Sequence, residues 1–153
     1  MELLSSRQVD FASVLLAGLA AGYVMELAGL WAAAIPGLVS LDIADFGRRY
    51  IVSDRPSAWL LGLGSHLANS VLLALIFAMA LVPNLHWPRP LLGLVWGEVL
   101  AFGFAGALMA PMAGLGFMGR KTRNWRFAVT IILMHALWGL VVGILYVPLA
   151  GAH

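Results

Sequence analysis

Four ionisable residues lie well inside the long apolar segments of this chain: Glu26, His66, Glu98 and His135. A titratable side chain is costly in lipid, so such residues usually face the interior of a helix bundle or a water-filled cavity. These four residues are therefore the candidates for chemistry, and the apolar segments that carry them must position them.

Three of these four residues are predicted to share one layer. His66 is the ninth residue of the apolar segment 58–81, and His135 is the ninth of the segment 127–149. At the rise of an α-helix, both rings lie ~12 Å from the same end of the bundle. Glu26 is the sixteenth residue of the segment 11–35, which runs in the opposite direction, so its depth is nearly the same. Glu98 lies in the other half of the bundle.

Three interpretations of this layer remain open. In the first, each imidazole donates to a carbonyl, a serine or Glu26 and only specifies packing, because interhelical bonds in membranes average about 0.6 kcal/mol. In the second, His66 and His135 are the two axial ligands of a haem b. In the third, Glu26, His66 and His135 bind a divalent metal ion. The identity of any cofactor is not fixed by these residues.

Glu98 has separate alternatives. Buried carboxyl groups in membrane helices are typical of proton or ion paths. A relay from Glu98 to Glu26 would need an intermediate group, for which Tyr23 is the obvious residue. The other interpretations are a protonated carboxyl that is hydrogen-bonded across helices, and a carboxyl that faces a quinone headgroup in a larger assembly.

The elements that position these residues are four apolar segments. The chain is 62% hydrophobic and 10% charged, with a mean hydropathy of +0.94, whereas soluble domains carry about 25% charged residues. Each segment exceeds the ~20 residues that a membrane-spanning helix needs. The sequence therefore predicts one domain, residues 1–153, with an all-α integral membrane fold: a four-helix transmembrane bundle with helices at about 11–35, 58–81, 91–115 and 127–149.

The basic residues predict the orientation of these helices. Seven of the nine lysines and arginines lie in the loops 36–57 and 116–126, and the other two are Arg7 and Arg89. By the positive-inside rule, both loops are cytoplasmic and both termini lie outside. Because topology explains the basic charge, no nucleic-acid partner is expected. Apolar residues recur at helical spacing in the segment 38–51, which predicts an amphipathic helix resting on the membrane surface.

The two halves of the chain are similar to one another. Gly18 and Gly22 match Gly93 and Gly97 at an offset of 75 residues, and His66 matches His135 at an offset of 69. Each half is a helical hairpin, so the prediction is two tandem hairpins related by a pseudo-twofold axis along the membrane normal.

Small residues and one proline bear on packing. Glycines at positions i and i+4, such as Gly93 with Gly97 and Gly139 with Gly143, let helix backbones approach closely within the bundle. Pro111 is expected to bend the third helix, because it has no N–H to offer the Ala107 carbonyl.

Two short motifs stand at corresponding places in the chain: Gly62-x-x-x-His66 in the second helix and His135-x-Leu-x-Gly139 in the fourth. With these motifs the sequence resembles a family of small bacterial proteins with four transmembrane helices and unknown function. The resemblance covers nearly the whole chain and implies a four-helix fold in a bacterial inner membrane. It implies no activity.

The sequence favours a non-catalytic accessory subunit of a larger membrane complex, respiratory or otherwise energy-converting. Its partners would be the lipid bilayer and other membrane subunits. A bundle of 16.4 kDa with little mass outside the membrane has little room for an active site of its own, and no nucleotide, serine-hydrolase or zinc-protease motif is found. Two alternatives remain: an electron carrier that binds haem b through His66 and His135, and a small proton or ion channel.

Overall fold

The computed structural model describes residues 9–45, 55 and 57–149, and all regular secondary structure in this part of the chain is helical. Four helical spans are long and apolar enough to cross a membrane: Phe11–Ala34, Ser57–Leu81, Arg89–Met112 and Trp125–Leu145. They contain 21 to 25 residues each. The predicted four-helix membrane bundle is confirmed, and the chain is a multi-pass membrane protein.

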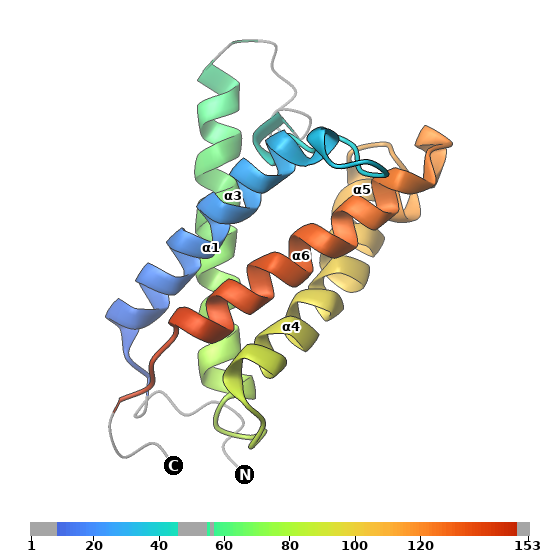
Figure 1. Cartoon of the computed structure of the whole chain (residues 1–153). Helices are drawn as coiled ribbons and strands as arrows, with labels where there is room; N and C mark the ends of the chain where they lie inside the picture. The colour runs from blue at the N-terminus through green and yellow to red at the C-terminus, as the bar shows by residue number, and fades with distance from the viewer. Residues whose placement is uncertain (1–8, 46–54, 56, 150–153) are drawn as a thin grey trace.

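Each span is built from one or more helical elements (Figure 1). The first consists of α1 (Phe11–Trp31) and the 3₁₀-helix η2 (Ala32–Ala34), and the second of α3 (Ser57–Ile76) and the π-helix η3 (Phe77–Leu81). The third consists of α4 (Arg89–Val99), the π-helix η4 (Leu100–Met109) and α5 (Ala110–Met112). After the 3₁₀-helix η5 (Phe117–Thr122), α6 (Trp125–Leu145) forms the fourth.

The ends of these helices follow from local chemistry. Asp10 caps α1 by accepting a hydrogen bond from Ser13 N, and Asn124 caps α6 by accepting one from Arg126 N. The third span ends at Met112 rather than at residue 115, since the chain turns at Gly114, which has a φ of +80°. The fourth ends at Leu145 rather than at residue 149, because the chain is extended before Pro148.

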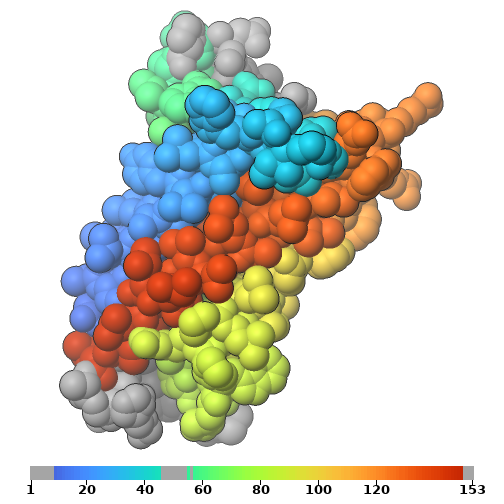
Figure 2. Space-filling view, in the orientation of Figure 1, coloured from blue at the N-terminus to red at the C-terminus, as the bar shows by residue number. Residues whose placement is uncertain are grey.

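The helices are arranged in the order α3, α1, α6, α4. α1 packs against both α3 and α6, and α6 packs most extensively against α4. Figure 1 shows α1 and α6 side by side in front of α3, and the space-filling view in Figure 2 shows them in contact along the same face. The predicted hairpins, α1 with α3 and α4 with α6, are therefore neighbours as expected.

The predicted pseudo-twofold relation does not extend to the packing between the hairpins. A twofold axis would repeat the α1–α6 contact as a contact between α4 and α3. In the described residues α1 and α6 pack closely, whereas α3 and α4 hardly touch. The two hairpins are thus joined on one side of the bundle and held apart on the other.

Glycines form the closest helix contact, between α4 and α6. A Cβ atom on Gly93 or Gly139 would overlap the backbone of the other, and a Cβ on Gly97 would overlap the carbonyl oxygen of His135. We call this contact, made by Gly93, Gly97, Gly139 and Gly143, the glycine seam. The prediction that these small residues pack within the bundle is confirmed.

The third span departs from the prediction at η4. Pro111 is expected to bend an α-helix. The ten residues Leu100–Met109 instead form a π-helix, and the N–H of the next residue, Ala110, bonds to Ala105 O. Most π-helical turns are short bulges, and they occur frequently at functional sites. Because Pro111 has no N–H, the α-helical bond to Ala107 O cannot form, and a wider register upstream is compatible with that loss.

The segment after the first span enters the end of the bundle. Leu41 and Ala44 are buried, and Val39 N–H donates to Thr130 Oγ1 over 3.1 Å. Asp42 caps a helical turn that begins at Ile43. The described part of the predicted surface segment 38–51 therefore packs against the ends of the helices, and residues 46–51 lie outside the described residues.

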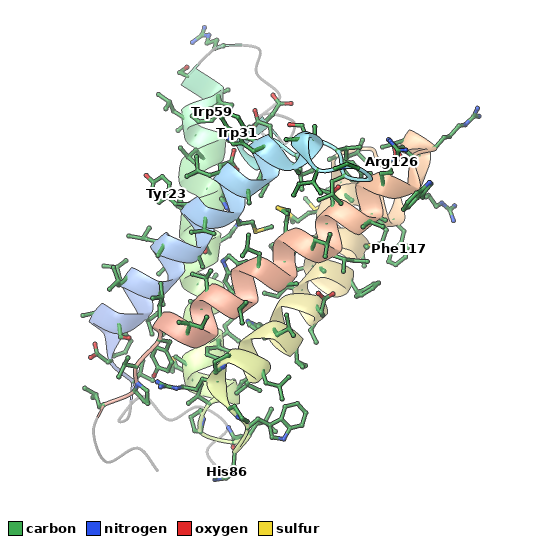
Figure 3. All side chains as sticks on the ribbon, viewed as in Figure 1. Tyr23, Trp31, Trp59, His86, Phe117 and Arg126 are labelled. Carbon is green, nitrogen blue, oxygen red and sulfur yellow. The ribbon has the colours of Figure 1, made fainter. Side chains whose placement is uncertain are left out.

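The two ends of the bundle differ in charge. Near the start of α1 and the end of α6, Val147 N–H donates to Ser13 Oγ over 2.7 Å, so the described ends of the chain meet. At the other end, which we call the basic end, lie the described cations of the two long loops: Arg55, Arg120, Lys121, Arg123 and Arg126. Figure 3 shows Arg126 and His86 at opposite ends.

Candidate functional site

A groove lies between α3 and the η4 part of the third span. It contains a cavity of about 120 Å³, and its walls come from α3, η4 and α6. Most of the lining is apolar, including Leu73, Leu100, Phe104 and Ile131. The polar side chains that line it are Ser65, His66, Asn69, Ser70, His135 and Trp138.

The contacts around the groove show where it is closed. The packed pair α1 and α6 lies beneath it, because Met25 and Trp138 line it and are buried. Away from the basic end, Trp96 Nε1–H donates to Leu73 O over 3.2 Å and connects α4 with α3. At the basic end Leu41 and Ile43 cover it. The cavity is only partly enclosed, and α3 and η4 make few contacts with each other, so the side between them is the one left uncovered.

His66 enters the groove from α3. Its Nε2–H donates to Gly22 O of α1 over 3.1 Å, because a carbonyl oxygen can only accept. Gly22 allows this approach: a Cβ there would press on Leu67 and Ser70 of α3. In the neutral ring, Nδ1 is then left as a hydrogen-bond acceptor.

His135 enters the groove from α6. Its Nδ1–H donates to Ile131 O, one turn earlier in the same helix, over 2.9 Å, so Nε2 of the neutral ring is left as an acceptor. The two imidazoles line the same cavity and lie close enough for a charge on one to act on the other. The prediction that His66 and His135 come together from two helices is confirmed as geometry.

A hydrogen-bonded chain fixes the inner wall of the groove. Trp138 Nε1–H of α6 donates to Ser70 Oγ of α3 over 2.6 Å, and Ser70 Oγ–H donates to Gly18 O of α1 over 2.6 Å. Neither Ser70 nor Trp138 is among the residues that the sequence predicts for a site. The sequence signal for this contact is the tryptophan itself, because the indole N–H of a buried tryptophan usually finds a hydrogen-bond partner.

Glu26 does not line the groove. It is only 3% exposed, and among the described residues its two carboxyl oxygens are the sealed side-chain atoms without a hydrogen-bond partner. The groups that act on it most directly are the Asp42 carboxyl and the backbone N–H groups of Ile43 and Ala44, although none reaches hydrogen-bonding geometry. Glu26 therefore faces the turn at the basic end rather than the two histidines.

The predicted three-residue metal site is not assembled. Within the described residues, no three side chains of the His, Cys, Asp or Glu type are placed so that they could hold a metal ion together. His66 lies beside Gly22, one turn of α1 away from Glu26, and a depth counted along a helix does not determine the face from which a side chain projects. His66 and His135 remain as a pair.

Glu98 also stands apart from the groove. It is half-buried on α4 and is not among the lining residues. Tyr23, the residue expected to connect Glu98 with Glu26, is 51% exposed and points away from the bundle in Figure 3. The structure therefore does not form the relay through Tyr23.

A haem bound by His66 and His135 would need suitably oriented rings and enough space in the groove. Each ring is oriented by a hydrogen bond to a backbone carbonyl, as is common for metal-ligating histidines. The cavity of about 120 Å³ is close to the volume that holds a single benzene ring, so most of a porphyrin would lie outside it. The size of the cavity therefore gives no support to the haem, which stays a prediction.

No family model, curated protein or solved structure matches this chain. The resemblance to small bacterial membrane proteins stays a prediction, and the site is interpreted from its own geometry.

Proposed function

We propose that this protein is a non-catalytic, membrane-embedded binding protein that holds a small lipid-soluble molecule in the groove between α3 and η4. The observation that carries the proposal is the pair His66 and His135. Each ring is fixed by a backbone carbonyl and keeps its other nitrogen as an acceptor, and both rings line one partly enclosed cavity.

The free nitrogens favour binding over a purely structural role. Among the described residues only the Glu26 carboxyl oxygens are sealed and unpartnered, so the two free ring nitrogens are not sealed inside the bundle and can be reached from the groove. Lipid tails offer them no hydrogen bonds. Here the backbone bonds orient the rings but leave one acceptor on each, and an occupant of the groove would satisfy both.

A variant that fills the groove tests the proposal. Ala105 lines the cavity, whereas Ala107, on the same π-helix, is exposed and does not. The wild type, Ala105→Phe and Ala107→Phe would be purified from membranes in mild detergent and extracted with organic solvent, and the extracts compared by mass spectrometry. We expect a molecule at a near-stoichiometric amount with the wild type and Ala107→Phe, and its loss with Ala105→Phe. Identical extracts from all three would refute a groove ligand.

We further propose that the protein serves as an accessory subunit in a bacterial inner membrane, beside a larger, energy-converting assembly that uses the same molecule. The charge asymmetry supports the orientation. Five described cations lie at the basic end and Arg89 lies near the other, which by the positive-inside rule makes the loops 36–57 and 116–126 cytoplasmic and both termini periplasmic.

The orientation can be tested directly because the chain has no cysteine. Single-cysteine variants His86→Cys and Lys121→Cys would be exposed to a membrane-impermeant maleimide on intact spheroplasts. We expect labelling of His86→Cys at once and of Lys121→Cys only after permeabilisation. The reverse pattern would overturn the orientation. Partners would be sought by isolating the protein in native detergent, where a lone monomer would count against the accessory role.

A further inference from the structure

The hydrogen-bonding capacity of the groove limits the chemistry of its ligand. His66 and His135 use one N–H each on a backbone carbonyl, so their remaining nitrogens accept hydrogen bonds when the rings are neutral. Two imidazolium ions in one largely apolar cavity would be costly. The ligand that satisfies both rings is therefore a donor, such as a molecule with hydroxyl groups, rather than an acceptor such as an ether or an anion.

The size and walls of the groove limit its shape. About 120 Å³ of cavity is close to the space that holds a single benzene ring. Phe104 of η4 and Trp138 of α6 both line it, and aromatic rings prefer edge-to-face or offset contacts with other rings. One planar aromatic ring fits these walls, and the polar atoms at its edge would meet the histidines.

The lateral opening limits what is attached to that ring. The groove is covered at the basic end by Leu41 and Ile43, and the Trp96–Leu73 hydrogen bond crosses its other end. The side between α3 and η4 is the exit that these covers leave for a substituent on the ring, and in a membrane-spanning bundle that exit would border lipid. An alkyl or isoprenoid tail is compatible with that exit, and a charged or sugar-bearing substituent is not.

We infer that the ligand is a lipid whose head is a hydroxylated aromatic ring, of the phenol or quinol type. Its hydroxyl groups donate to the free nitrogens of His66 and His135, and its apolar tail leaves the groove laterally. This inference rests on the proposed binding function and names the chemical class of the ligand.

Two probes that differ only in their hydroxyl groups test the inference. Decylhydroquinone and its dimethyl ether have the same ring and tail, but only the first can donate hydrogen bonds. Binding of each to the purified protein would be measured without oxygen, from the concentration dependence of the thermal unfolding midpoint. We expect half-maximal stabilisation by decylhydroquinone at a concentration at least 10-fold below that of the ether, since one or two net hydrogen bonds separate them.

The histidines provide the matched variants. His66→Phe and His135→Phe keep a planar ring and remove the acceptor, so each is expected to reduce the preference for decylhydroquinone over the ether by about 3- to 10-fold. If neither variant folds, the wild type still tests the inference: equal binding of decylhydroquinone and its dimethyl ether would contradict it. A preference that is unchanged in both folded variants would overturn the inference.

The remaining outcomes separate this inference from the proposed function. If both probes bind wild type equally and Ala105→Phe abolishes both, the groove binds lipids but does not select hydroxyl groups, and only the inference fails. If neither probe binds and organic extracts of the wild type and Ala105→Phe are the same, the proposed function fails with it.

Discussion

The third span contains both the tightest contact of the bundle and its open groove. Its first part, α4, is α-helical and packs backbone to backbone against α6 through the glycine seam. Its second part, η4, is a π-helix that makes far less contact with α6 and lines the groove. A Cβ on Gly97 of α4 would meet the backbone of α6, whereas a Cβ on Gly103 of η4 would meet nothing within 4 Å.

This difference shows that small residues alone do not determine packing. Each part of the span contains two glycines. In α4 both glycines face α6 and close the gap between the helices. In η4 the wider π register places side chains around the helix differently: Gly106 packs against Met118, whereas Gly103 meets nothing. We expect variants in the seam and in the groove to respond in opposite ways.

The largest effect is expected in the seam. Gly139→Ala adds one methyl group where the Gly93 backbone lies, and overpacking against a rigid backbone should lower the free energy of unfolding by about 3 kcal/mol. Unfolding in mixed micelles with increasing sodium dodecyl sulfate would measure it. Gly103→Ala is the matched control and should change the free energy by less than about 0.5 kcal/mol. Equal losses in the two variants would show that the seam and η4 do not differ in packing.

A smaller loss is expected at the inner wall of the groove. Ser70→Ala removes the hydroxyl that accepts from Trp138 and donates to Gly18 O. It leaves the buried indole N–H without a partner, so the free energy of unfolding should fall by about 2 kcal/mol. Ser65→Ala, in the same helix and exposed, should leave stability unchanged. If Ser70→Ala were as stable as the wild type, the hydrogen-bonded chain would not hold the wall in place.

The sequence predicts the four spans, the pairing of His66 with His135 and the glycine contacts for one reason. Each depends on the spacing of residues along a helix or on the size of a side chain, and both are known from the sequence. The faces of the helices are harder to predict, because nearly every residue in a span is apolar and no polar stripe marks the outside. The prediction that Glu26 joins the two histidines is therefore wrong, because Glu26 does not line the groove.

Other features depend on contacts that arise only on folding. The π register of η4 reflects Pro111 together with the neighbouring helices, and a proline in an apolar segment more often predicts a simple bend. The entry of Leu41 and Ala44 into the bundle depends on the space that the helix ends leave, so it is not encoded in the amphipathic pattern. The groove itself results from the small number of contacts between α3 and η4, and it has no signal in the sequence.

A modest effect is expected where the two regions meet. Trp96 donates its indole N–H to Leu73 O, across the gap between α4 and α3. Trp96→Phe keeps an aromatic ring and removes this bond, so it should cost about 1 kcal/mol and allow α3 to move away from α4. Spin labels on α3 and α4 would measure the distance by pulsed electron resonance. Trp87→Phe, at an exposed position, is the control; a distance distribution unchanged in Trp96→Phe would show that the bond does not hold the groove.

The smallest change in stability is expected for the largest added side chain. Ala105→Phe introduces a whole ring, but it projects into the cavity and buries apolar surface that would otherwise border empty space, so the free energy of unfolding should change by less than about 1 kcal/mol, toward greater stability. One methyl group at Gly139 should therefore destabilise the bundle more than a benzyl ring at Ala105. The same detergent unfolding assay measures both variants. A loss of about 3 kcal/mol in Ala105→Phe would mean that the groove is as tightly packed as the seam, and the distinction between the two halves of the span would disappear.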